Sequence, residues 1–347
     1  MIKKILKYAK NLILLTLSLA GIYLFNLFFM KPFSIDHFLG KELVFGLVDS
    51  PEAMTYIGIF DRFNWLTRHN SKLSIPEKDD QENSIKQYEQ VIKTLYKYED
   101  SSLSEVQKNT KKIAIFDAEN NLKQVKEFPH HDYPLNQIGG IHLNTIEFLS
   151  DMHPIRNESE AKDFIKRVNL IKKLYTGVLA DLEEQADAGI FPPEFVYDHV
   201  INQLSDFINY NYDEHPLYTQ FLRKVKELNL SIEKEKLYEE QIKIAINESV
   251  TPGFKILRDF MMQTKQYANK NHGIWSQPNG DEYYKLRIRS YTTTDYSPEE
   301  IHQMGLEEVD RISSRMREIL TELGYDKNKT VGELMNELNE NPEFLYE

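Results

Sequence analysis

The side chains best suited to binding a ligand lie between Tyr283 and Thr294, where tyrosine, arginine and threonine residues recur. On an edge strand, alternating hydroxyl and guanidinium groups can bind a peptide backbone and its carboxylate. The turn-forming run Pro278-Asn279-Gly280 precedes them, so residues 273–294 predict a small β-hairpin. A hairpin that only packs against helices explains the same pattern, and both interpretations stay open. The predicted substrate-binding residues of this segment are Tyr283, Tyr284, Arg287, Thr292 and Thr293.

Metal chemistry is restricted by the residue types present. The chain has no cysteine, which excludes thiolate nucleophiles, disulfides, cysteine-ligated metals and a lipidated cysteine. None of the ten histidines is followed by Glu and no two are four residues apart, so a His-Glu-x-x-His zinc helix is missing. His130-His131-Asp132 could ligate a metal, but adjacent ligands in a proline-flanked loop more often form a solvated surface turn. We predict no metal ligand and no catalytic residue in this chain.

Other signatures of catalysis are also missing. The sequence contains no GxGxxG, GxxxxGK[ST] or GxSxG segment, which disfavours nucleotide loops and a nucleophile elbow. His142 and His153 are eleven residues apart and would share one face of an unbroken helix. Because Pro154 ends that helix, we expect both histidines to have capping or core roles.

The elements that would position these residues are mainly helical. Capping patterns and apolar residues at helical spacing predict helices over 85–98, from Asn157 to Gly189, from Pro192 to Ile208, and from Ile232 through an interruption near Pro252 to Met261. The best specified helix begins at the capping box Ser297-Pro298-Glu299-Glu300 and runs to Gly324. Residues 113–116 are expected as a short β-prone run before a turn at 117–121. We predict a mainly α fold with one small β element.

The amino terminus directs the chain to a membrane. Four lysines within residues 1–10 precede twenty uncharged residues, 11–30, which at about 1.5 Å per residue just span a hydrocarbon core of roughly 30 Å. Lysines before the span hold the amino end in the cytoplasm, so the body is exported. We predict residues 1–31 as a basic region and single-pass inner-membrane anchor, and residues 32–347 as one helical domain on the periplasmic or extracellular side. A cleaved signal peptide, suggested by Ser18 and Ala20 before Gly21, and a buried helix are the alternatives.

The exported body is acidic. All five basic residues before Pro32 lie in a segment with no acid, so the net charge of −12 for the whole chain becomes −17 for residues 32–347. Such a body repels polyanions, and we expect no nucleic-acid partner.

Several segments in order resemble one known family. They are residues 134–140, 148–155 and 188–193, residues 273–280 with Tyr283-Tyr284, residues 291–294, and residues 298–309. Together they are similar to the bacterial "domain of unknown function 885" family across about residues 45–325. The resemblance implies a helical, zincin-like architecture related to thimet-oligopeptidase-like enzymes. It also implies zinc held by His-Glu-x-x-Pro-Gly-His and a later Glu, with the first Glu as general base.

This chain departs from the family where the chemistry resides. The implied zinc ligands belong to the carboxyl-terminal half of the family, and no zinc ligand or base can be carried over to a residue here. The resemblance adds His302 to the predicted substrate-binding set, although a structural role is equally open. We expect an amino-terminal, truncated or split portion of a peptidase-like protein without hydrolysis of its own, and zinc only if the missing half or a partner chain supplies it. The rival hypothesis is a tethered helical scaffold that binds peptide-like ligands without turnover.

Overall fold

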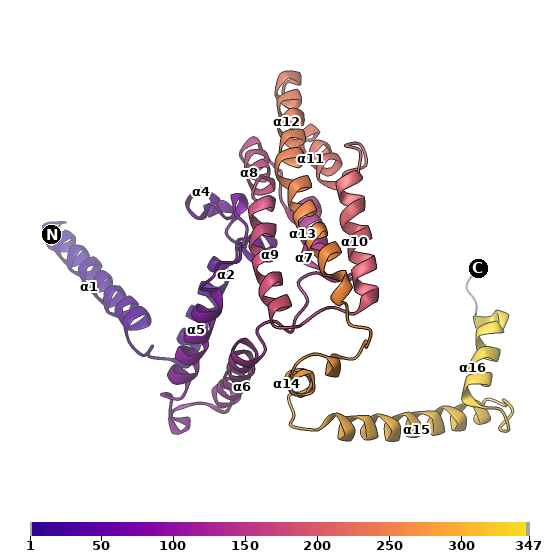
Figure 1. The fold of residues 1–347 in the computed structure, drawn as a ribbon. Coiled ribbons are helices and arrows are strands. Elements are labelled where there is room, and N and C mark those ends of the chain that lie inside the picture. The colour runs from indigo at the N-terminus through magenta and orange to yellow at the C-terminus, as the bar shows by residue number, and fades with distance from the viewer. Residues whose placement is uncertain (1, 345–347) are drawn as a thin grey trace. The chain divides into compact units, whose positions relative to one another are not determined.

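The computed structural model describes residues 2–344, and nearly all regular structure in that range is helical (Figure 1). The chain divides into two compact units, Met1–Gly280 and Asp281–Glu347. The α-helices are α1 (Ile2–Phe29), α2 (Ile35–Asp49), α3 (Pro51–Ile57), α4 (Asn64–Thr67), α5 (Asp80–Leu95), α6 (Glu105–Glu127), α7 (Ile141–Glu147), α8 (Glu158–Val168), α9 (Ile171–Asp187), α10 (Glu194–Asn209), α11 (Pro216–Lys226), α12 (Ile232–Ala245), α13 (Thr251–Thr264), α14 (Gly280–Thr292), α15 (Pro298–Glu322) and α16 (Val331–Glu340).

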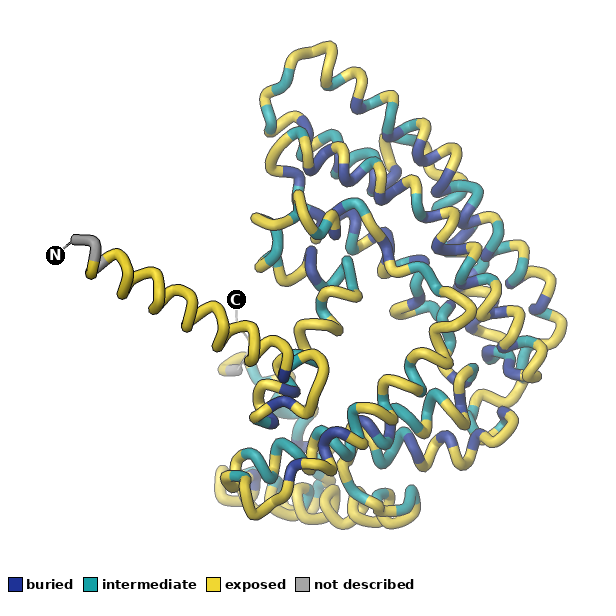
Figure 2. The backbone as a smooth tube through the Cα atoms, turned by 90° about the vertical axis from the view of Figure 1, so that its left-hand side faces the viewer, coloured by how far each residue is buried: buried dark blue, intermediate teal, exposed yellow. Residues whose placement is uncertain are grey.

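The core of the first unit is formed by α8 to α13. Apolar residues three and four apart on α9, α10 and α13 face one another, and Figure 1 shows these three helices side by side. Phe164 of α8 stacks on Phe221 of α11 with ring centroids 4.9 Å apart. The buried residues in Figure 2 concentrate on the inward faces of these helices. This core is the rigid body against which the segment at 51–72 packs.

A small second core joins the end of α1 to α5. The Asn26 side chain donates to the Lys31 carbonyl and accepts from the Phe33 amide, both at 2.8 Å, which fixes the turn after α1. Ile35 and Phe38 of α2 are buried against Tyr98, whose hydroxyl donates to the Pro32 carbonyl at 2.8 Å. The first turns of α2 are therefore attached to the body.

Two predicted helices are confirmed with different boundaries. The helix expected from Asn157 to Gly189 is broken at Asn169-Leu170 into α8 and α9. The interruption expected near Pro252 is a π-helical turn, Ile246–Val250, that keeps α12 and α13 continuous. The expectation of a β-prone run and turn at 113–121 is wrong, because these residues lie inside the 23-residue α6, which a capping box at Ser104 starts.

The predicted β-hairpin at 273–294 is also wrong. Residues 280–292 form α14, preceded by a single 3-10 turn, Ile274–Ser276. The turn residues do form a turn, with Asn279 at φ 56°, but it starts a helix instead of joining two strands. Tyr283 and Leu286 are both buried and are three residues apart, a spacing that places them on one face of a helix. The alternation of residue types that suggested a strand does not match this pattern of burial.

The second unit contains most of α14 and the two helices that follow it. α15 begins with the predicted capping box: Ser297 accepts from the Glu300 amide at 3.1 Å, and the Glu300 carboxylate accepts from the Ser297 amide at 2.7 Å. Leu320 of α15 and Leu334 of α16 are buried. Most other apolar side chains of α15 are exposed, including Leu306, Val309, Ile312 and Ile319.

Candidate functional site

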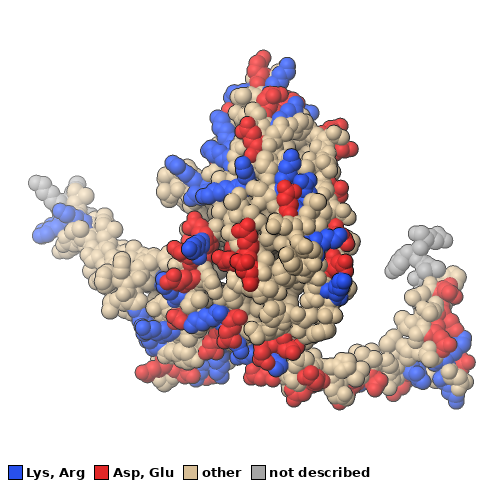
Figure 3. Space-filling model, viewed as in Figure 1, with Lys and Arg blue, Asp and Glu red and all other residues tan. Residues whose placement is uncertain are grey.

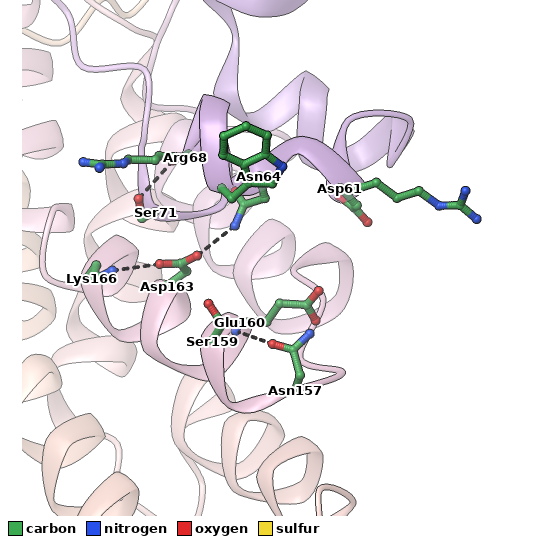
Figure 4. A pocket seen from close by; sticks show the side chains of 11 residues that line it. Asp61, Asn64, Arg68, Ser71, Asn157, Ser159, Glu160, Asp163 and Lys166 are labelled. Carbon is green, nitrogen blue, oxygen red and sulfur yellow. Dashed lines mark hydrogen bonds and ion pairs between the residues drawn. The ribbon is translucent and has the colours of Figure 1, made fainter.

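A polar pocket of about 740 Å³ lies between α8 and the segment 61–71. Figure 4 shows its lining side chains, with Arg68 and Lys166 at one end and Asp61 and Glu160 toward the other. The exposed indole of Trp65 completes its apolar part. The lining residues are Asp61, Arg62, Asn64, Trp65, Arg68, Ser71, Asn157, Ser159, Glu160, Asp163 and Lys166.

Local structure places the two sides of this pocket. Asn157 caps α8 by accepting from the Glu160 amide at 3.1 Å, which sets the first turn of the helix. Glu160 and Asp163 are three residues apart and therefore share one face of α8. On the opposite side, Asn64 donates to Asp163 at 2.9 Å and accepts from the Asn70 amide at 3.1 Å. Asn64 thus holds the 61–71 segment in register with α8.

The carboxylates of the pocket are held by cations. The Arg156 guanidinium donates to Asp61 at 2.6 Å and to Glu160 at 2.8 Å, and its own amide donates to Glu160 at 2.6 Å. The hydrogen bonds with Glu160 are the main reason why the pKa of Arg156 is raised. Lys166 donates to Asp163 at 2.9 Å. Each carboxylate keeps lone pairs for a further donor.

Behind the pocket, Arg167 is completely buried. Its guanidinium donates to the carbonyls of Lys72 and His69 and to the Thr55 hydroxyl, and it bonds His153 Nδ1 at 3.0 Å. Burial lowers the pKa of Arg167 to about 10. No carboxylate is among these hydrogen-bond partners, so neutral groups of the 51–72 segment solvate the charge. Arg167 therefore ties that segment to the helical core.

The buried His69 ring contacts Thr67 and the pocket residue Asp61. Its Nδ1 lies 2.7 Å from the Thr67 hydroxyl and its Nε2 lies 3.4 Å from Asp61. Burial is the largest cause of its lowered pKa, so the ring is neutral near pH 7. Assigning the proton to Nε2 satisfies both contacts, with Thr67 donating and Asp61 accepting. Because the ring is buried and both nitrogens are engaged, His69 positions Asp61 instead of contacting a ligand.

The donors present do not fit a zinc site. Among residues 2–344, no three His, Asp or Glu side chains gather at metal-binding distance. The buried histidines are committed elsewhere: His142 pairs with Gln203 at 3.0 Å, His153 with Arg167, and His215 caps α11 by accepting from the Leu217 amide. Both His142 and His153 are fully buried, which confirms the core role expected for them. No catalytic step is therefore assigned to a metal held by these residues.

The loop at His130-His131-Asp132 differs from the solvated turn that was expected. His131 is buried, and its Nε2 lies 2.7 Å from the Pro278 carbonyl oxygen. It joins the loop after α6 to the turn before α14 and so has a structural role.

The six residues predicted to bind substrate all lie in the second unit. Tyr283, Arg287 and Tyr291 form a ladder along α14, with the Arg287 guanidinium 5.1 Å from the Tyr291 ring centroid. Tyr283 is buried, whereas Tyr284, Thr292, Thr293 and His302 are exposed. None of the six lines the pocket on α8, and their role in binding stays a prediction.

Sequence reasoning missed the pocket on α8 for an identifiable reason. Its residues come from segments about a hundred positions apart, and only the fold brings Asn64 to Asp163. The one local signal was the capping pattern at 157–160, which we interpreted as a helix start and not as one side of a site.

The comparisons with known proteins decide the family. The model of the family described as "Bacterial protein of unknown function (DUF885)" matches residues 51–347. The chain belongs to the DUF885 family. The resemblance identified from the ordered segments is thereby confirmed.

A solved structure shares this DUF885 fold. It is a protein from Colwellia psychrerythraea named as a lipoprotein, 25% identical, with a TM-score of 0.72. The match covers 87% of this chain but only 54% of that one, so this chain spans about half the length of its structural relative. No curated protein matches the sequence.

Proposed function

We propose that this chain is the membrane-tethered, exported, ligand-binding portion of a peptidase-like DUF885 protein, and that it does not hydrolyse peptides by itself. The observation that carries the proposal is the pocket on α8, with Arg68 and Lys166 at one end and Asp61 and Glu160 toward the other. A short peptide with free termini has the matching charges, a carboxylate at one end and an ammonium at the other. The carboxylate would bind the basic end.

Size and desolvation support this ligand class. A volume of about 740 Å³ is in the range of small-ligand sites and accommodates a few residues. Glu160 and Asp163 are mostly buried, so their charges are screened less than those of surface groups. Trp65 offers a ring face to one side chain of the peptide.

Tethering is supported by α1. It contains Leu6–Phe29, a 24-residue stretch long and apolar enough to cross a bilayer, as either a signal sequence or an anchor. Figure 3 shows α1 with basic side chains only near its amino end. The structural relative is named as a lipoprotein, but this chain has no cysteine to carry a lipid, so attachment would rely on α1. The four lysines place its amino end in the cytoplasm and the body outside.

The second half of the proposal concerns hydrolysis. The sequence has no His-Glu pair, so no residue of this chain matches the His-Glu-x-x-Pro-Gly-His segment that the family resemblance implies. Within the second unit, α15 leaves Val309, Ile312 and Ile319 uncovered, and in this proposal the additional chain of longer relatives packs on them.

The binding site is tested with matched lysine variants of the full chain. In a Trp275→Phe background Trp65 is the only tryptophan, so its fluorescence reports the pocket. We expect saturable quenching by the tripeptide Ala-Phe-Ala with free termini and none by its acetylated, amidated form. Lys166→Gln should weaken binding about tenfold, equivalent to 1.4 kcal/mol.

Lys162→Gln is the control, because Lys162 lies on the same helix but pairs with Glu158 and does not line the pocket. Equal affinities for the Lys166 and Lys162 variants, or no saturable signal, would overturn the assignment of the pocket.

A further inference from the structure

The second half of α2 exposes an apolar run that the body does not cover. Residues 43–48, Leu-Val-Phe-Gly-Leu-Val, contain no polar side chain. Leu43, Val44, Phe45 and Val48 are 41–65% exposed, whereas Ile35 and Phe38 at the start of the helix are buried. The exposed run therefore lies between the buried start of α2 and the buried Met54 of α3.

The distribution of these side chains around α2 indicates what covers them. At about 100° per residue, Leu43, Val44, Phe45, Leu47 and Val48 cover a little over half of the helix circumference, and the remaining sector holds Gly46, Glu42 and Asp49. α15 is different, since its exposed apolar residues are separated by charged ones and form a stripe. A stripe of separated apolar residues fits a protein groove, whereas a contiguous apolar face beside a polar sector fits surroundings that are apolar on one side and polar on the other. Lipid provides such surroundings for 43–48.

The position of α2 supports the same occupant. It follows α1 after a turn fixed by Asn26. The ring centroid of Phe45 lies 5.8 Å from that of Phe28, which is near the end of α1. The family match begins at residue 51, so α2 lies before the matched DUF885 region. The apolar run is instead continuous with the proposed span.

We propose that residues 43–48 insert into the bilayer beside α1, as a second and shallow membrane contact. The run is about 9 Å long and therefore too short to span, whereas an interfacial helix lies along the membrane surface with its apolar face about 5–10 Å deep. Lys41 and Glu42 before it and Asp49 after it stay at the polar surface. Two contacts, α1 and α2, would hold the body close to the membrane at a fixed tilt. This inference rests on the anchoring part of the proposed function.

The absence of cysteine allows a clean test on the full chain. Single-cysteine variants Val44→Cys, Val48→Cys, Leu19→Cys and Ile232→Cys are labelled with an environment-sensitive NBD dye and reconstituted into phosphatidylethanolamine–phosphatidylglycerol vesicles. Leu19 lies within α1, and Ile232 is an exposed apolar residue of α12 on the body. Lipids with a nitroxide in the acyl chain quench only labels that contact the hydrocarbon.

We expect strong quenching at positions 19, 44 and 48 and none at 232. If 19 is quenched while 44 and 48 behave like 232, the inference is overturned and anchoring by α1 stands. If 19 is not quenched either, anchoring itself fails. Labels at 44 and 48 that are shielded from aqueous iodide yet unquenched by the lipid would mean that a protein covers α2, which also overturns the inference. Two positions are used so that one poorly folded variant does not decide the result, and circular dichroism verifies each fold.

Discussion

At the scale of single residues, the most consequential side chain is Arg167. A buried charge is costly unless polar groups replace its hydration, and here backbone carbonyls and one hydroxyl of the 51–72 segment do so. Phe148 adds a ring face 5.0 Å from the guanidinium. The same segment carries Asp61 and Asn64, so Arg167 supports the pocket together with the Asn64–Asp163 and Arg156–Asp61 contacts.

Removal of the Arg167 charge should destabilise the protein. Arg167→Met leaves the Lys72 carbonyl and His153 Nδ1 buried without their donor, and we expect a loss of about 3 kcal/mol in the free energy of unfolding. Urea titration followed by circular dichroism measures this. Arg223→Met is the control: Arg223 is exposed and pairs only with Gln220 and Glu227, so its change should stay below about 1 kcal/mol. Similar losses in both variants would contradict the anchoring role.

A second prediction at the residue scale concerns the loss of stability at low pH. Burial lowers the pKa of His215 to about 4, below the usual 6.5, so between these pH values the unfolded chain binds a proton that the folded chain does not. Stability is therefore complete above pH 6.5 and falls as the pH drops toward 4. His153 and His142 have lowered pKa values as well and contribute with the same sign.

The His215→Asn variant isolates this effect. Asparagine can still cap α11, but it does not titrate, so the loss of stability between pH 7 and pH 5 should shrink by up to about 2 kcal/mol. Thermal melts at both pH values measure the difference. Parallel pH profiles for the variant and the native protein would show that His215 is not responsible.

At the scale of elements, the sequence predicted those helices whose ends carry their own signals. The capping box at Ser297 set the start of α15, and Pro192-Pro193 preceded α10 as expected. The break between α8 and α9 and the π-helical turn at 246–250 were not predicted at their observed positions, because both depend on partners distant in sequence. The break between α8 and α9 lies beside the π-helical turn at 246–250, and Ser249 joins the two. Its hydroxyl accepts from the Lys172 amide and donates to the Val168 carbonyl, each at 3.0 Å.

Removal of the Ser249 hydroxyl should destabilise the protein measurably. Ser249→Ala leaves the Lys172 amide and the Val168 carbonyl buried without this partner, so we expect a loss of about 1–3 kcal/mol in guanidinium unfolding. Ser205→Ala removes a hydroxyl that bonds only to Ile201 on its own helix and should cost about 0.5 kcal/mol or less. If the two serines cost the same, α8, α9 and the π-helical turn are not coupled through Ser249.

At the scale of the whole molecule, the amino-acid composition and the apolar run at the amino terminus led to correct predictions. The helical class, the apolar amino-terminal helix and the family followed from the sequence, whereas the pocket on α8 required the fold. The match covers 54% of the structural relative, and we propose that this chain binds ligand in the pocket on α8. Binding without turnover is the central claim.

The most direct test incubates the reconstituted full chain with a mixed library of short free-ended peptides, with and without added zinc, and analyses bound and free fractions by mass spectrometry. We predict that peptides are retained intact and at equal levels under both conditions, and that Lys166→Gln releases them. Zinc-dependent appearance of new peptide termini, absent from a mock preparation, would contradict the account.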